Sequence, residues 1–200
     1  PKRPPPPAAV ARVVRADIAH AADDLLRRPS AQRTNIGAAL AFDGFSAGER
    51  HLGADLYFTY WLAPLVGLEL SVGARRGLAV SSRNGSMQAT ALGGAFGVLL
   101  RPLRWQHAAI AAGASLRVVG VVFRGAAVDA SAALASSDTG LAVSARARAG
   151  GLFTVGRLQL RVFGGLGAPI AGVAGTDDGE RVSAVSGLEI FGQLGVGFAL

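Results

Sequence analysis

The chain has no cysteine, a single lysine and no apolar run long enough for a membrane-spanning helix. The lack of cysteine excludes disulfide bonds and thiolate-bound metals. A spanning helix needs about 20 consecutive apolar residues. The best windows are short and rich in glycine, as in 87–100, or interrupted by an arginine, as in 108–123. Disulfide-stapled domains and helical membrane proteins are therefore excluded.

What the chain does contain is apolar residues, which make up half of its 200 positions, against 16% charged residues. The mean hydropathy of +0.39 is high for a water-soluble protein of this size. The net charge of +7 would suit a nucleic-acid partner, but the arginines are spread along the chain at alternating positions, so we predict none. No charged segment followed by an apolar one stands at the start, so we expect any signal peptide to have been removed.

The first 32 residues differ in composition from the rest. Five prolines lie within 1–7, which predicts an extended polyproline II spacer. Residues 8–28 carry apolar side chains at helical spacing and predict a short amphipathic helix that ends before Pro29. We expect 1–32 to form an arm that serves as a linker or packs on a neighbouring surface. A plug or a partner-binding segment is the alternative.

From Arg33 onward the dominant period is two, which places alternate side chains on opposite faces of a β-strand. Eight such segments fill 33–200. The clearest segment has one apolar face, formed by Leu52, Ala54, Leu56, Phe58, Tyr60 and Leu62. Its other face is small or polar. An apolar face could point either into a soluble core or out into lipid, and the composition of the opposite face decides between the two.

That opposite face is rich in glycine, alanine and serine, with scattered arginine and glutamate. Such residues suit a narrow barrel interior, whereas a water-facing exterior would carry many lysines, and the one lysine is Lys2. The pattern predicts an all-β fold, an eight-stranded antiparallel up-and-down transmembrane β-barrel over 33–200. A soluble ligand-binding barrel of lipocalin type is the alternative, which would purify without detergent.

The connections between the segments alternate in length. Tight turns are expected at 63–64, 102–104 and 155–156, and longer polar connections at 44–50, 76–86, 124–139 and 173–184. Bacterial outer-membrane barrels show this alternation, with short periplasmic turns and longer extracellular loops. We therefore expect both termini on the periplasmic side of a bacterial outer membrane. Tyr60, Trp61 and Trp105 lie beside the short turns, where an interfacial aromatic belt is expected.

On these grounds the chain resembles the small eight-stranded outer-membrane barrels, a group that includes the transmembrane domain of the outer membrane protein A family. The resemblance is architectural and covers 33–200. Its sharpest motif is the end of the chain, which looks like the C-terminal assembly signal of such barrels, formed here by Gln193, Gly195, Phe198 and Leu200. Leu200 departs from the aromatic residue that is usual at the last position. The resemblance implies outer-membrane lipid and the barrel assembly machinery as partners.

An eight-stranded barrel has an interior just wide enough for side chains to fill it. Charged residues on the inward face should therefore form a buried ionic network, for which we predict Asp55, Glu69, Arg75, Arg117, Arg146, Arg148, Arg157, Arg161 and Glu189. Arginine exceeds carboxylate in this set. Some guanidinium groups should then reach water or loop carboxylates, because an unpaired buried charge is costly.

Catalysis is not indicated. Acyl hydrolysis needs a nucleophile, a base and an orienting carboxylate. Of the three histidines only His51 lies near an extracellular rim, where it could approach Ser46 or Glu49. No metal or cofactor is predicted either, since the acidic turn at 177–180 supplies too few oxygen ligands for calcium.

The sequence thus favours a non-enzymatic barrel that acts as an anchor or a structural component of a cell-envelope assembly. Its arm would be available to a periplasmic or envelope partner. The alternatives are a lipid-modifying enzyme or a narrow solute channel of the same fold.

Overall fold

The structure is a computed structural model, and it describes residues 33–82, 84–127, 137–177 and 180–200. The expected proline-rich linker and amphipathic helix of 1–32 lie outside the described residues. Residues Arg33–Leu200 form a compact unit of their own. None of the described residues belongs to a helix long and apolar enough to cross a membrane.

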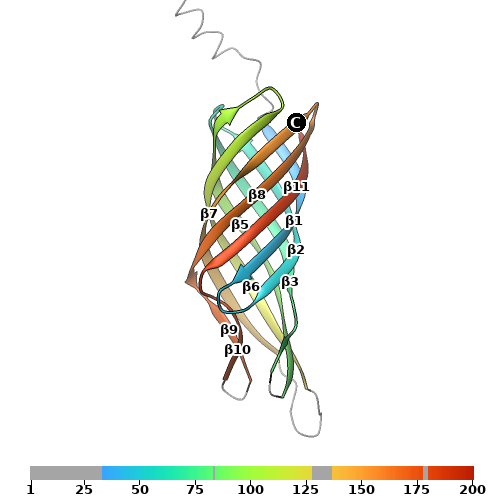
Figure 1. Ribbon diagram of the computed structural model, residues 1–200, viewed down its shortest axis with the longest axis vertical. Helices are drawn as coiled ribbons and strands as arrows, with labels where there is room; N and C mark the ends of the chain where they lie inside the picture. Colours follow the sequence, from blue (N-terminus) through green and yellow to red (C-terminus); the bar gives the residue numbers. More distant parts are fainter. Residues whose placement is uncertain (1–32, 83, 128–136, 178–179) are drawn as a thin grey trace, which may run out of the picture. The chain divides into compact units, whose positions relative to one another are not determined.

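Eight long strands make up the wall of this unit, and Figure 1 shows how they are arranged. They are β1 (Thr34–Phe45), β2 (Arg50–Trp61), β3 (Val66–Gly77), β5 (Gly85–Arg104), β6 (Ala108–Ala127), β7 (Ser137–Val155), β8 (Leu158–Ala171) and β11 (Glu189–Ala199). Three shorter strands extend from the wall: β4 (Val80–Ser81), β9 (Val173–Asp177) and β10 (Glu180–Val185). The predicted all-β fold with eight antiparallel strands is confirmed.

The wall closes into a barrel because its first and last strands pair with each other. The β1–β11 register is unbroken from Asn35↔Ala199 to Phe45↔Glu189. Every other long strand pairs antiparallel with its neighbour in sequence, and the β3–β5 ladder spans the short β4 excursion. Closure leaves the described eight-stranded wall without a free first or last strand, which is the condition for placing strands in hydrocarbon.

The period of two in the sequence becomes an outward and an inward face. Large apolar side chains project outward along all eight strands, with Leu40, Leu56, Leu92 and Leu194 each 57–68% exposed. On β2 the burial alternates strictly from Arg50 to Trp61. Because the apolar residues are outside and the charged residues inside, the arrangement is the reverse of a soluble barrel.

The two ends of the barrel differ. The terminal end holds the start of β1, the end of β11 and the short turns 62–65, 105–107 and 156–157. The turn 156–157 is a two-residue hairpin in which Gly156 has a φ of +61°, a conformation that favours glycine. The opposite end, here called the loop end, carries the β9–β10 hairpin (Figure 1).

Some expected connections are shifted or shorter than predicted, because strands continue into them. Residues 102–104 belong to β5, so the turn comes later, at 105–107. The expected loop 173–184 is mostly the β9–β10 hairpin, and the first loop-end connection shrinks to residues 46–49. Polar composition suggested loops here, but unpaired backbone groups favour continuing the ladders wherever a partner strand is in reach.

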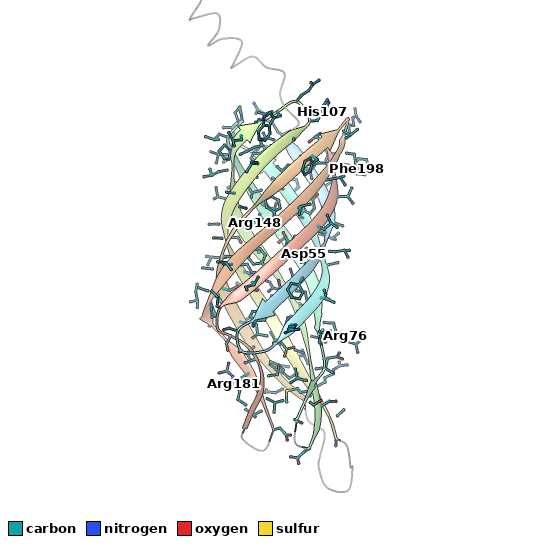
Figure 2. The ribbon with its side chains drawn as sticks, viewed as in Figure 1. Asp55, Arg76, His107, Arg148, Arg181 and Phe198 are labelled. Atoms are coloured by element: carbon teal, nitrogen blue, oxygen red, sulfur yellow. The ribbon has the colours of Figure 1, made fainter. Side chains whose placement is uncertain are left out.

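The lumen is filled in three layers. An apolar cluster near the loop end consists of Phe45, Met87, Ala89, Ala91, Val119, Val121, Phe123, Ala142 and Val185. A second apolar cluster near the terminal end consists of Trp61, Leu99, Ala109, Ala111, Leu152 and Phe163. Between them lies the charged middle, in which Figure 2 labels Asp55 and Arg148. This position makes the charged layer the candidate site.

Candidate functional site

The charged layer, here called the lumen network, joins four carboxylates and five arginines from seven strands. Its members are Asp43, Asp55, Glu69, Arg75, Arg117, Arg146, Arg148, Arg161 and Glu189. All but Arg148 are buried, and the side chain of Arg148 is nearly so. Since a buried charge is tolerated only when it is paired, the pairing pattern decides how the lumen is stabilised.

The half nearer the loop end is centred on Asp43. Its Oδ2 lies 2.6 Å from Arg75 Nε and 3.0 Å from Arg117 Nη1, and its Oδ1 lies 3.1 Å from Arg146 Nη2. Arg75 also donates to both oxygens of Asp55, at 2.9 and 2.7 Å. This bidentate pairing of a guanidinium with a carboxylate is the strong and directional form of the ion pair.

Glu189, on β11, completes this half. Arg146 donates from Nε to Glu189 Oε2 at 2.9 Å and forms a second, very close contact with Oε1. Arg117 Nη1 lies 3.3 Å from the same Oε1. Glu189 therefore contacts two arginines, and Asp43 contacts the same two.

The half nearer the terminal end is centred on Glu69. Arg148 Nη2 and Arg161 Nη1 each lie 2.7 Å from a carboxylate oxygen of Glu69, and the Thr59 hydroxyl donates to it at 3.0 Å. Glu69 is the only carboxylate that these two arginines contact among the described residues. Removing its charge would leave both of them without a counter-ion.

Gln193 links the two halves. Its amide nitrogen donates to Asp55 Oδ2 at 2.8 Å, and its amide oxygen accepts from Arg161 Nη2 at 3.1 Å and from Arg148 Nη1 at 3.3 Å. A neutral side chain with both a donor and an acceptor is suited to join an acidic group to basic ones. The network is thus continuous along the lumen.

Aromatic rings support several of the guanidinium groups. Arg161 Cζ lies 3.5 Å from the centroid of the Tyr57 ring, and Arg146 Cζ lies 4.4 Å from that of Phe191. Arg148 stands over Phe163 at 4.9 Å. A ring face attracts a cation, more strongly where water is excluded. These contacts help to offset the excess of one arginine over the carboxylates.

Glycines on the neighbouring strands make room for the network. Asp55 pairs with Gly73 and Arg75 with Gly53 in the β2–β3 register. A Cβ on Gly73 would lie 2.1 Å from Asp55 Oδ1 and one on Gly53 2.8 Å from Arg75 Cγ. The same opposition recurs for Glu69 with Gly97, for Arg161 with Gly195 and for Glu189 with Gly167. Each long polar side chain therefore extends over a position that has no side chain.

Eight of the nine residues predicted for the lumen network meet in it. The exception is Arg157, which is exposed in the two-residue turn between β7 and β8. Strict alternation placed it inward, but the strand ends before it, so its side chain reaches water. Asp43 was missed, although it occupies an inward position of β1 next to the outward Phe42, and continuing the alternation by one residue would have found it.

The two tryptophans differ in their exposure. Trp61 is buried at the terminal end, with Arg101 Cζ 3.9 Å above its ring, so its prediction as a lipid-facing interfacial residue is wrong. It has the inward parity of β2, whereas its neighbour Tyr60 points outward. Trp105 is exposed in a turn at the terminal end. Phe153 on β7 and Phe198 on β11 face outward near the same end and are exposed too.

The residues of the expected assembly signal alternate as the motif requires. Gln193 and Gly195 face the lumen, and Phe198 and Leu200 face outward. The role of this motif in assembly stays a prediction. Its first residue has a second, structural part to play as the link within the lumen network.

A smaller polar cluster lies at the loop end. His51 Nε2 is 3.2 Å from Glu49 Oε1, and the Ser183 hydroxyl on β10 donates to the other oxygen of Glu49. His51 does approach Glu49, as the sequence suggested. The serine, however, is bonded to the carboxylate and not to the imidazole, and all three residues are buried. This order does not match the nucleophile–base–carboxylate arrangement of acyl hydrolysis.

Little empty space remains in the lumen network. A cavity of about 20 Å³ lies among its arginines, with Asp55, Glu69, Ser71 and Gln193 in its lining. A volume of this size holds about one water molecule. This cavity therefore has no room for an organic ligand.

Comparisons with known proteins agree with this architecture. No protein-family model matches the sequence, and no curated protein does. A major outer membrane protein from Thermus thermophilus is similar in structure, with a TM-score of 0.61, 15% identity and coverage of 82% of this chain and 97% of that one. Ail, the attachment invasion locus protein of Yersinia pestis, gives a TM-score of 0.49 and 13% identity, with coverage of 82% and 95%. On the first of these likenesses and the closed eight-stranded wall, the chain has the fold of the small bacterial outer-membrane β-barrels.

Proposed function

We propose that the chain is a transmembrane barrel of a bacterial outer membrane that serves as a non-conducting, non-enzymatic anchor or structural component of the cell envelope. The observation that carries the proposal is that the faces are the reverse of those in a soluble barrel: 35 large apolar residues are exposed, while the charges of the lumen network are buried and paired. In water such an exterior would drive aggregation, whereas in lipid it is favourable.

The height of the apolar surface fits a bilayer. On β2 and at the residue that follows it, the outward apolar residues run from Leu52 to Leu62. Ten residues at about 3.4 Å each, tilted by about 40°, span about 26 Å, close to the apolar band of about 25 Å in outer-membrane barrels. The exposed aromatic residues at the terminal end then lie at one membrane boundary, where their rings are favoured.

The filled lumen supports an anchor in preference to a channel. A solute would have to cross two apolar clusters and a continuous layer of ion pairs. Breaking one buried pair costs about 3–5 kcal/mol. Passage would require several pairs to open together, so conduction is disfavoured.

The proposal includes an orientation and partners. With the terminal end in the periplasm, the arm of 1–32 would be available to a periplasmic or envelope partner, and the C-terminal motif to the barrel assembly machinery. The chain has no cysteine, so single cysteines can report on sidedness. A cysteine at Arg157, exposed in the turn 156–157, should be shielded from a membrane-impermeant maleimide on whole cells, and one at Ala47 should be labelled. The reverse result would contradict this orientation.

Reconstitution tests the anchor role. We expect the purified chain to need detergent, to insert into phosphatidylcholine vesicles and to cause no swelling in small sugars, with an open porin as the positive control. Lipid hydrolysis should equal that of empty vesicles. Swelling at the porin rate would show a channel, lipid cleavage that Glu49→Gln abolishes would show an enzyme, and a folded monomer in plain buffer would exclude the membrane role.

A further inference from the structure

Three arginines face outward at the loop end, on three strands of the part of the wall formed by β2, β3, β5 and β6. Arg50 lies on β2, Arg76 on β3 and Arg124 on β6, and all three are exposed. They share the outward parity of the apolar residues, so they belong to the outer wall and not to the lumen. Figure 2 shows Arg76 projecting from the wall. These residues are here called the arginine patch.

The strand register brings the three together. The carbonyl of Arg50 accepts a hydrogen bond from the backbone N–H of Leu78, which lies two residues after Arg76 and just beyond the end of β3. Arg76 donates from Nε and Nη2 to the Gln88 side chain on β5, at 3.0 and 2.8 Å. Gln88 in turn pairs with Arg124. Diagonal neighbours in a sheet are within reach of long side chains, so the patch is continuous over four strands.

Among the described residues of its four strands, the patch has no acidic partner on its own face. The only carboxylates on β2, β3, β5 and β6 are Asp55 and Glu69, and both are turned into the lumen. The charges of the patch are therefore not neutralised by these strands. In addition, Gln88 orients the guanidinium of Arg76 and leaves its Nη1 without a bond to Gln88.

The position of the patch selects its ligand. Arg50 stands two residues beyond Leu52 on the same face, and Arg76 pairs with Leu52 across the ladder, so the arginines border the apolar band directly. A lipid whose chains lie against the band would hold its headgroup at their level. Guanidinium groups bind phosphate oxygens in pairs. The other half of the wall has no outward charge at this level among the described residues, with Phe42, Ile170 and Ile190 there instead.

Resting on the proposed membrane role, we propose that the arginine patch is a binding site for a phosphorylated lipid headgroup in the leaflet at the loop end. The lipid would carry phosphate monoesters, whose two charges and three free oxygens suit several arginines at once. The site would fix how deeply the barrel sits in the membrane. It would also hold the bound lipid on one side of the barrel, against β2, β3, β5 and β6.

Native mass spectrometry of the detergent-solubilised barrel, titrated separately with diphosphoryl lipid A, phosphatidylcholine and inorganic phosphate, tests the proposal. We expect selective binding of lipid A, weakened by salt. Each arginine replaced should lower the affinity about fivefold and the triple variant Arg50→Gln, Arg76→Gln, Arg124→Gln about a hundredfold. The control variant Arg33→Gln, Arg104→Gln, Arg157→Gln loses the same charge at the terminal end and should lower it less than about fivefold.

Equal loss in the two triple variants, or inorganic phosphate binding as tightly as lipid A, would overturn the lipid site. If the triple patch variant does not fold, Arg124→Gln alone decides, because its side chain makes no hydrogen bond among the described contacts that the barrel would lose. Insertion of the wild-type chain into vesicles is scored separately. A chain that inserts but does not prefer lipid A refutes this site alone, and a chain that inserts nowhere refutes the membrane role as well.

Discussion

Replacing Glu69 by glutamine should be the most damaging single change of charge in the lumen. Glu69 is the one carboxylate in contact with both Arg148 and Arg161, at 2.7 Å each. Glutamine keeps the shape but presents an N–H₂ group toward guanidinium donors and the Thr59 hydroxyl. Among the described residues, the two buried cations then keep only Gln193 and aromatic rings as partners.

The magnitude follows from the cost of an unpaired buried charge. Breaking a buried ion pair by removing one partner costs about 3–5 kcal/mol, and here two arginines lose their partner, so we expect a loss of about 4–5 kcal/mol. Arg146→Leu should cost less, about 3 kcal/mol, because Asp43 and Glu189 both retain Arg117. The ranking of the two variants depends on how many ion-pair partners the remaining charges keep, and not on the number of charges removed.

The assay is equilibrium unfolding in urea of the barrel in vesicles, followed by tryptophan fluorescence. With a slope of about 2–3 kcal/mol per molar, Glu69→Gln should lower the midpoint by about 2 M. The double variant Glu69→Gln with Arg148→Leu removes one of the unpaired cations and should recover about half of the loss. A shift below about 1 kcal/mol, the size expected for an exposed pair, would refute the reasoning, because it would mean that water reaches the lumen network.

Three further outcomes test the placement of individual residues. Brominated lipid should quench the variant Trp61→Phe, which retains the exposed Trp105, far more than Trp105→Phe, which retains the buried Trp61; equal quenching would contradict the inward position of Trp61. Leu56→Arg, at mid-band, should lower the free energy of unfolding by about 2–4 kcal/mol and Leu62→Arg, at the edge, by about 0–1 kcal/mol, as read from urea midpoints; similar costs would argue against a lipid-facing band. Hydrogen bonds from Asn84, at 3.1 and 3.3 Å, lower the pKa of Asp177 below its ordinary 3.8, so this contact stabilises the loop end above that pH and is lost as the pH falls through the lowered pKa. Amide exchange of Asn84 measured from pH 6 to 2 would show it, and a rate of opening that stayed constant would exclude it.

The fold was predictable because its signal is repeated. Every strand shows the same alternation of apolar and polar residues, so the weak pattern in β5 is supported by the seven other strands. The strand order then follows from the connections. Strand ends were less predictable. A polar stretch such as 173–184 reads as a loop, although its backbone can still pair with itself as β9 and β10.

The site was predictable to the extent that parity decides which way a side chain points. Parity placed Asp55, Glu69 and Arg146 in the lumen, but it failed for Arg157, where the strand had already ended. It could not say which carboxylate meets which arginine, because partners such as Arg146 and Asp43 lie on strands far apart in the sequence. Long polar residues lie opposite glycines on the neighbouring strand, as Asp55 does with Gly73. This signal appears only when two strands are aligned in register, so the sequence of a single strand does not contain it.

The last strand, β11, has a consequence for how the barrel is completed. The five lumen arginines lie on β3, β6, β7 and β8, and without β11 only Asp43, Asp55 and Glu69 oppose them. An incomplete sheet of seven strands would thus present an excess of two positive charges beside two unsatisfied edges. Arrival of β11 contributes Glu189, the Gln193 bridge and the closing ladder in one step. A wall without β11 is therefore unfavourable in lipid, and closure of the backbone ladder and pairing of the remaining lumen arginines with Glu189 should occur as a single event.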